Sequence, residues 1–394
     1  MTCVHSMGSP RAASARRATF TAAGAFALAL GALPARAQAP PPQDQPNMAM
    51  TAAMKQSTID SLAAAIEANY VFPDVAKKTA AALRAKVKRG GYAGLDSAEA
   101  FADSLTQDLQ AIGHDHHFRV GYWHRELAPG AFTPHGPSDE ERARMAAMSR
   151  RLNYGFERVQ RLFGNIGYLD LRGFEGTPEA GTAAMAAMTL LNNSDALIID
   201  LRRNGGGDPN MIMLLLSWLM PADDRVHVND FYLRDGDRTE QYFTLTTIPG
   251  PRYAGKDVYV LISHRTGSAA EEFAYDIKNL KRGTLVGETS VGAANPGEVV
   301  RVNAHFAAFI SNGRAVNPIS KTNWEGVGVD PDVATSADDA LKTAHIAALT
   351  KLIERESDPE RRPVLERSLQ AAREAPVEPL DLPPSRPRPP AAGR

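Results

Sequence analysis

Hydrophobic positions near the start of the chain recur at helical spacing. The spacing is that of one helix face in residues 59–70, 80–87 and 101–112. Ser57 and Thr58 form a helix start signal before the first of these segments, and glycines follow the other two. The run from His117 to Tyr122 alternates between polar and apolar residues, which predicts a short strand. We therefore predict a small N-terminal helical domain over residues 56–122.

Residues 158–340 show a different pattern, in which short apolar runs alternate with helical segments. Apolar runs predict strands over residues 166–171, 196–201, 258–263, 284–286 and 299–310. Helical patterns fall over residues 176–193, 211–220 and 269–280. Continuous apolar runs are typical of strands covered on both faces, and the alternation of strands and helices predicts an α/β core. Terminal helices are predicted within residues 341–375.

The first 37 residues have the layout of a secretory signal peptide. Arginines precede an apolar, alanine-rich run, and the small-x-small signal Ala35-Arg36-Ala37 follows it. This run is too short and too rich in alanine for a membrane span. The pair Arg16-Arg17 leaves a twin-arginine export route open. We expect an exported protein, periplasmic or secreted, with no integral membrane segment after cleavage.

Three further segments are predicted to be a flexible linker, a connector between the two domains and a disordered tail. Residues 38–55 are rich in Pro, Gln and Met and are expected to be a flexible linker. Residues 123–157 contain three prolines and the charged run DEERAR, which indicates a connector with a solvated helix face. Residues 376–394 are rich in proline and predict a disordered tail.

Charge and cysteine content exclude several classes of protein. The formal net charge is −1, and removal of residues 1–37 takes away four arginines and no acidic residue, leaving about −5. A mildly acidic surface argues against nucleic acid or an anionic membrane as the main partner. The only cysteine, Cys3, lies in the predicted signal peptide. The mature chain therefore has no disulfide, no thiol nucleophile and no cysteine-ligated metal.

Ser268 lies where a predicted strand turns into a predicted helix, and it has two interpretations. With Glu271 three residues later, it matches a helix capping box. A serine at such a turn is also how several hydrolases present a nucleophile, although the G-x-S-x-G motif is absent. Free N–H groups at the helix N-terminus, including that of Ala269, favour negative charge there. The stretch by itself favours the cap, because serine is a common N-cap residue.

A glycine-rich turn follows the strand over residues 196–201. Asn204 is followed by Gly205, Gly206 and Gly207. Glycines let a backbone approach a ligand closely, and successive N–H groups can bind an anion. A nucleotide-binding P-loop is excluded because the G-x-x-x-x-G-K-[ST] motif is absent. The remaining alternatives are a phosphate site, an oxyanion hole and a simple tight turn.

Two polar segments are candidates for further catalytic groups. Residues 113–117 contain His114, His116 and His117, which suggest a zinc site, a general base or an exposed loop. Zinc is disfavoured because the chain lacks H-E-x-x-H and any evident distant ligand set. Glu325 lies among glycines beside a tryptophan, where it can orient a histidine or simply be a solvated turn acid.

These motifs, in this order, resemble the family of C-terminal processing (tail-specific) serine peptidases. That family also contains tricorn protease and the interphotoreceptor retinoid-binding protein modules. The matching stretches are DHHF at 115–118, NYGFERV at 153–159, GNIGYLDLRGF at 164–174, ALIIDLRRNGGG at 196–207, VYVLISHRTGSAAEEFA at 258–274, TLVGETSVGAANPGE at 284–298 and NWEGVGVDPDV at 323–333. The resemblance covers most of residues 56–340.

The resemblance implies a crotonase-like (ClpP/crotonase) α/β core and assigns roles to five residues. Ser268 falls on the family's nucleophile, while Ala293 stands where one branch has a dyad lysine. The tricorn-like branch uses Ser, His and Glu, which here are Ser268, His117 and Glu325. The resemblance also implies an oxyanion hole formed by the N–H of Gly206, or of a neighbouring glycine, and the N–H of Ala269. The implied activity is hydrolysis of a peptide or protein substrate through an acyl-enzyme, without metal or cofactor.

One departure from the family opens an alternative. About 35 residues lie between His124 and Arg158, too few for the PDZ domain that many relatives carry, so none is expected. The overall sequence pattern is closest to that of the retinoid-binding modules. The competing hypothesis is therefore a non-catalytic carrier of small apolar ligands. The joint presence of the three candidate catalytic residues favours an enzyme. Activity that survives a chelator would exclude a third option, a hydrolase with a metal on the histidines.

Overall fold

The computed structural model describes residues 45–132, 139–223, 225–380 and 382. The predicted signal peptide and most of the predicted tail lie outside these residues. None of the helices in the described part of the chain combines the length and the apolar character needed to cross a membrane.

Three helices form the N-terminal part: α1 (Ala52–Asn69), α2 (Pro73–Lys88) and α3 (Ala98–Gly113). The Thr51 and Ser97 side chains cap α1 and α3, and proline begins α2, where its missing N–H costs nothing. The first helix begins four residues before the predicted domain boundary. Met50 is buried, so order extends into the segment that was expected to be a flexible linker.

A three-stranded sheet packs against these helices, and its strands come from both ends of the chain. Its order is β1 (Arg119–Tyr122), β10 (Phe306–Ser311) and β9 (Gly297–Arg301). The prediction of one strand over residues 299–310 is wrong, because the chain reverses there. The Asn303 side chain accepts hydrogen bonds from the N–H groups of His305 and Phe306 and closes the turn.

The central sheet has six strands in the order β12-β8-β7-β4-β3-β2. They are β2 (Phe156–Leu162), β3 (Ile166–Leu171), β4 (Ala196–Asp200), β7 (Asp257–Ile262), β8 (Thr284–Gly287) and β12 (Val333–Ala334). All pairs are parallel except β2 with β3, so the sheet is mixed. The predicted α/β class is therefore correct, and the four inner strands match the predicted apolar runs.

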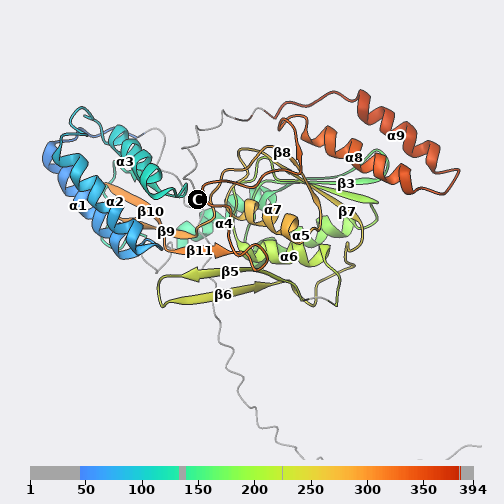
Figure 1. Cartoon of the computed structure of the whole chain (residues 1–394), viewed down its shortest axis with the longest axis horizontal. Helices are drawn as coiled ribbons and strands as arrows, with labels where there is room; N and C mark the ends of the chain where they lie inside the picture. Colours follow the sequence, from blue (N-terminus) through green and yellow to red (C-terminus); the bar gives the residue numbers. More distant parts are fainter. Residues whose placement is uncertain (1–44, 133–138, 224, 381, 383–394) are drawn as a thin grey trace, which may run out of the picture. The chain divides into compact units, whose positions relative to one another are not determined.

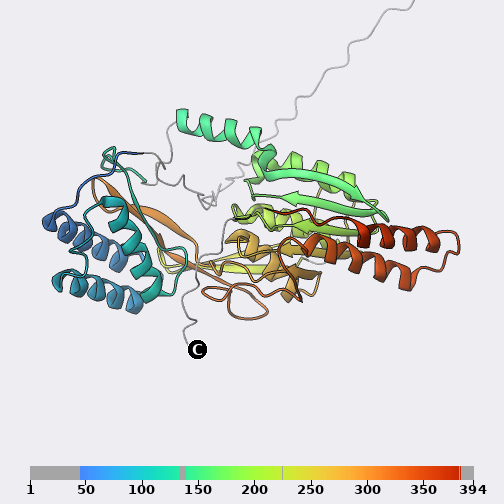
Figure 2. The same ribbon diagram turned by 90° about the horizontal axis from the view of Figure 1, so that it is seen from above.

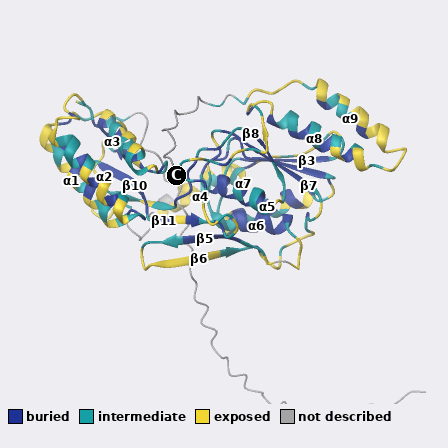
Figure 3. Ribbon diagram, in the orientation of Figure 1, coloured by how far each residue is buried: buried dark blue, intermediate teal, exposed yellow. Residues whose placement is uncertain are grey.

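Helices cover both faces of this sheet (Figures 1 and 2). On one face lie α5 (Thr177–Leu191), α6 (Pro209–Leu219) and α7 (Ala269–Asn279), and on the other α8 (Ala340–Arg355) and α9 (Arg362–Glu374). Successive residues of β4 alternate between the two hydrophobic cores: Leu197 faces the first and Ile198 the second. Figure 3 shows the inner strands β3 and β7 in the colour of buried residues, as their mainly apolar sequences require.

Some of the observed strands were not predicted from the sequence, and the helix of the connector was predicted only in part. A second sheet has the order β11 (Gly313–Val316), β5 (His227–Leu233) and β6 (Arg238–Phe243). The predicted connector contains α4 (Asp139–Arg151) and a short 3-10 turn, η1 (Asn153–Gly155). The strands β5, β6 and β11, like β2, mix polar and apolar residues without regular alternation. Their apolar pattern is weak because they are edge strands or only partly buried.

The first residues of the predicted disordered tail are held against the core. Lys342 Nζ donates to the Ala375 carbonyl at 2.8 Å. The N–H of Leu380 donates to Asp338 Oδ1 at 2.9 Å, and Arg203 donates to the Leu380 carbonyl at 3.2 Å. Leu380, in the predicted tail, therefore has polar partners next to the start of α8 and just after the end of β4.

Candidate active site

Ser268 sits at the junction between the loop after β7 and the first turn of α7. Its backbone has φ 53° and ψ −123°, a conformation that side-chain-bearing residues rarely adopt. The carbonyl of Ser268 accepts from the N–H groups of Glu271 and Glu272 and so opens the helix. Strain of this kind persists only where neighbouring contacts hold it, and it concentrates at functional sites.

Glu271 supplies those contacts with a fully buried carboxylate. It accepts from the N–H of Ser268 at 2.9 Å, which is the Glu271 half of the predicted capping box. It also accepts from the N–H groups of Gly292 and Ala293 and from the Ser290 hydroxyl, at 2.5–2.9 Å. Burial raises the pKa of Glu271 to about 7, against the opposing effect of these four donors. Glu271 thus ties the strained serine to the loop 290–293.

The glycine turn packs directly against Ser268. Gly206 has φ +114°, and a Cβ added there would lie 2.8 Å from the Ser268 Cβ and 3.0 Å from the Ala269 nitrogen. The N–H of Gly206 donates to Asn204 Oδ1 at 2.9 Å. Within the described residues, the N–H groups of Gly207 and Ala269 have no hydrogen-bond acceptor. The structure therefore brings the predicted oxyanion residues beside Ser268 but gives the Gly206 N–H another partner.

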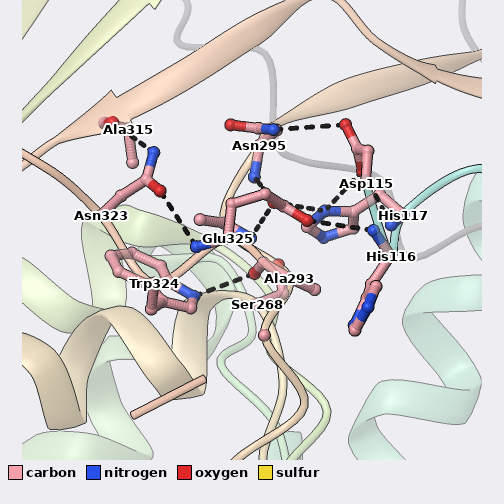
Figure 4. Close-up of polar contacts among 12 residues, drawn as sticks. Asp115, His116, His117, Ser268, Ala293, Asn295, Ala315, Asn323, Trp324 and Glu325 are labelled. Carbon is pink, nitrogen blue, oxygen red and sulfur yellow. Dashed lines mark hydrogen bonds and ion pairs between the residues drawn. The ribbon is translucent and has the colours of Figure 1, made fainter. Parts of the chain in front are cut away.

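His117 lies between two carboxylates (Figure 4). Its Nδ1 is 3.9 Å from Asp115 Oδ1 and 3.9 Å from Glu325 Oε2. The ring stacks on Phe309 with centroids 5.5 Å apart, and its Nδ1 is buried without a hydrogen-bond partner among the described residues. Burial lowers the pKa of His117, and the negative charge of Asp115 opposes this effect. The ring is therefore biased towards its neutral form, as a general base requires.

Backbone donors hold Glu325 in place. Its Oε1 accepts from the N–H of His116 at 3.0 Å, and its Oε2 accepts from the N–H groups of Ala294 and Asn295 at 2.6 and 2.9 Å. Burial raises the pKa of Glu325 well above its usual range, and the charge of Asp115 raises it further. Glu325 is not a freely solvated turn acid, because the three N–H groups fix its position.

Asp115 is a site residue that the sequence prediction did not assign. It is fully buried; its Oδ1 accepts from the N–H of His117 at 2.9 Å and its Oδ2 from Asn295 Nδ2 at 3.2 Å. It lies in the stretch DHHF at 115–118, which also contains His117, so the signal was present in the sequence. Asn295 had no such signal, because only the fold brings it to Asp115 over a separation of 180 residues.

The three histidines occupy different environments. His114 is exposed and ends α3 in the left-handed conformation. His116 places its Nδ1 3.0 Å from the Val291 carbonyl. Only His117 has its ring nitrogen beside the two carboxylates. Asp115, His117 and Glu325 also form a candidate metal-binding group, with one ligand atom from each within 4.8 Å of the others.

The site consists of two halves joined by the loop 290–295. Ser268, Ala269 and Gly206 form one half, and His117 and Glu325 the other. The loop binds Glu271 through the N–H of Ala293 and Glu325 through the N–H of Ala294. Within the described residues no hydrogen bond joins Ser268 to His116 or His117, and Figure 4 draws none. The residues within each half are therefore in contact, but Ser268 and His117 do not form a hydrogen bond with each other.

The helix that follows Ser268 buries two further acids, which predict a pH effect on stability. Glu272 and Asp276 are 3% and 1% exposed, and the amides of Asn229 and Asn317 donate to them. Burial raises the pKa of Glu272 to about 8, and burial and then Glu272 raise that of Asp276. The folded chain therefore keeps a proton on Glu272 in a pH range where the unfolded chain has lost it.

We expect the free energy of unfolding to fall as pH rises from about 4.5 to about 8, because the folded state binds more protons in this window. Between pH 6 and 8 the fall from Glu272 is about 2 kcal/mol. Urea denaturation of the wild type and Glu272→Gln at both pH values measures it. The variant should lose much of the slope, while Glu179→Gln, an exposed acid in the first turn of α5, should keep it. Equal slopes for the wild type and Glu272→Gln would contradict the prediction.

Comparison with known proteins places both parts of the chain in one family. Residues 165–335 match the model described as "Peptidase family S41", and residues 48–160 match the "N-terminal domain of Peptidase_S41 in eukaryotic IRBP". The chain is 30% identical over 175 residues to carboxyl-terminal-processing peptidase 2, chloroplastic, from Arabidopsis thaliana. It is 28% identical over 176 residues to the chloroplastic C-terminal processing peptidase of Tetradesmus obliquus.

These matches cover 42% and 43% of this chain, and 31% and 34% of the two relatives, so the chain spans about a third of each. A solved structure of a candidate peptidase from Parabacteroides merdae has a TM-score of 0.52 at 17% identity, over 77% of this chain and 99% of that one. That likeness bears on the fold alone. With both family models matched in the expected order, the chain belongs to peptidase family S41.

Proposed function

We propose that this chain is an exported serine peptidase that hydrolyses peptide bonds through Ser268, His117 and Glu325. The observation that carries the proposal is the strained Ser268 at the start of α7, packed against the glycine turn and tied by one loop to a buried histidine–carboxylate group. Membership of family S41 supports it. We also propose a crotonase-like core without a PDZ domain; the described residues between His124 and Arg158 form only α4, η1 and the start of β2.

In the proposed reaction, His117 Nε2 removes the proton from Ser268, and the serine oxygen attacks the carbonyl carbon of the substrate. Glu325, together with Asp115, stabilises the imidazolium through Nδ1. The oxyanion is stabilised by the N–H of Ala269 and by an N–H of the glycine turn, for which Gly207 is available. The proton then passes to the leaving amine, and water hydrolyses the acyl-enzyme. The Ser268–His117 hydrogen bond forms when substrate binds, since catalytic contacts are often long in ligand-free sites.

A serine-reactive probe tests the nucleophile directly. We expect a fluorophosphonate to label the wild type and to fail with Ser268→Ala, because only an activated hydroxyl reacts with it. Labelled peptides identified by mass spectrometry locate the adduct. Ser336→Ala, which removes an exposed serine, should label as the wild type does. Equal labelling of the wild type and Ser268→Ala would remove the basis for the mechanism and favour a non-catalytic binding protein.

Gly206 and Gly205 form a matched pair of substitutions. A Cβ at position 206 would push on Ser268 and on the Gly267 carbonyl, 2.9 Å away, whereas one at position 205 meets no atom within 4 Å. We expect Gly206→Ala to lower kcat/KM on a peptide by about 100-fold or more, because small displacements of a catalytic group are costly. Gly205→Ala should retain activity near that of the wild type. Similar losses in both variants would show that the close approach to Ser268 does not matter.

A further inference from the structure

Asp115, His117 and Glu325 form a group in which two carboxylates have no cationic side chain as a partner among the described residues while His117 is neutral. Asp115 is fully buried, and the Glu325 side chain is 13% exposed. In the part of the chain that the structure describes, neither carboxylate forms an ion pair with a lysine or an arginine. Two nearby carboxylates out of water without a cation are unfavourable. The group therefore suits a positive charge at its centre.

The unpaired atom of His117 faces that centre. Its Nδ1 is buried, has no hydrogen-bond partner among the described residues, and is equally far, 3.9 Å, from an oxygen of each carboxylate. This distance is too long for a hydrogen bond. An ion bound at about 2.1 Å to each of two atoms spans up to about 4.2 Å between them, so both distances admit a shared metal ion. One ligand atom from each of the three residues lies within 4.8 Å of the others, so the three residues surround a common position.

We propose that a divalent transition-metal ion of the Zn²⁺ class binds Asp115 Oδ1, His117 Nδ1 and Glu325 Oε2, and that it inhibits the enzyme. One imidazole nitrogen with two carboxylate oxygens is a ligand set that suits Zn²⁺ and Co²⁺ better than Ca²⁺ or Mg²⁺, which prefer oxygen ligands alone. Three protein ligands leave a fourth position for water. The His117 side chain is 17% exposed, so the group lies close to the protein surface.

Inhibition follows from the chemistry of His117. A metal ion on Nδ1 lowers the basicity of Nε2, which must accept the proton of Ser268. It also withdraws Glu325 from its role of stabilising the imidazolium. Any proton that Glu325 carries leaves to solvent when the ion binds. The inhibition rests on the proposed peptidase function, but the binding does not.

Isothermal titration with ZnCl₂ tests the binding on the Ser268→Ala chain, prepared without a histidine tag. We expect one site, with affinity at least tenfold weaker after a second substitution, His117→Ala or Glu325→Gln. The matched control is His114→Ala, which removes an exposed histidine three residues away and should leave the affinity unchanged. The absence of a site, a site insensitive to His117→Ala, or a site lost with His114→Ala would each overturn the proposal.

Two further measurements test the binding through thermal stability and the inhibition through activity. The melting temperature of Ser268→Ala should rise with ZnCl₂, and that of Ser268→Ala/Glu325→Gln should not; equal rises would contradict the site. With the wild type, ZnCl₂ should lower peptide hydrolysis and a chelator should restore it. Activity lost on chelation would overturn the inhibitory role. A wild type that binds Zn²⁺ but hydrolyses nothing would refute the peptidase proposal while leaving the metal site in place.

Discussion

Ser268→Ala is expected to lower kcat on a peptide substrate by about 10⁴-fold or more, since no other group can form the acyl-enzyme. His117→Ala should have an effect of the same order, because an un-ionised hydroxyl is a poor nucleophile. The double variant should be no slower than either single variant, because residues that act as one unit lose their joint contribution at the first substitution. Steady-state kinetics of the three variants measure this.

The double variant is the informative one here, because no hydrogen bond joins Ser268 to His117 in the structure. Effects that multiply would mean that the two residues act independently, which contradicts the proposed proton transfer. His114→Ala is the matched control for the histidine and should keep the activity of the wild type. His116→Ala distinguishes the remaining histidine: if it, rather than His117→Ala, removes activity, the general base has been assigned to the wrong ring.

Glu271→Ala is expected to lower the free energy of unfolding by about 3–5 kcal/mol, because four donors lose their only shared acceptor. The N–H groups of Ser268, Gly292 and Ala293 and the Ser290 hydroxyl all point at this carboxylate. Released from these bonds, Ser268 can relax from its strained conformation, so activity should fall as well. Urea denaturation at constant pH measures the first effect, and peptide hydrolysis of the folded fraction the second.

Glu271→Gln separates shape from charge. Glutamine keeps the volume but turns an NH₂ group towards N–H donors, so we expect it to recover only part of the stability. Glu179→Ala provides the baseline, because Glu179 also lies in the first turn of a helix but is exposed. A change below about 1 kcal/mol in Glu271→Ala would mean that the loop 290–293 is held by other contacts.

Local patterns were sufficient for the buried part of the fold. Strands β3, β4 and β7 are apolar over most of their length because helices cover them on both sides, and such runs are visible in the sequence. The same reasoning failed for β2 and β6, whose exposed edges tolerate arginine and glutamine. It also merged β9 and β10 into one strand, because the turn between them depends on the Asn303 side chain and not on a glycine.

Ser268 and its immediate surroundings follow from short-range features of the chain. A buried strand, a turn, a serine and a helix with Glu271 in its first turn lie within about 20 residues, so periodicity and capping rules place them. The glycine turn that contains Gly206 is equally local, since it follows the end of β4. The conformation of each depends on its own neighbours in the chain, and for that reason the prediction was possible.

The surroundings of His117 are decided by tertiary packing. Glu325 reaches the histidine loop from 209 residues further along the chain, and Asn295 reaches Asp115 across 180 residues. No pattern in the sequence encodes these distances, because the packing of the core sets them. Residue types indicate which groups are capable of catalysis, whereas their partners depend on contacts between segments far apart in the chain.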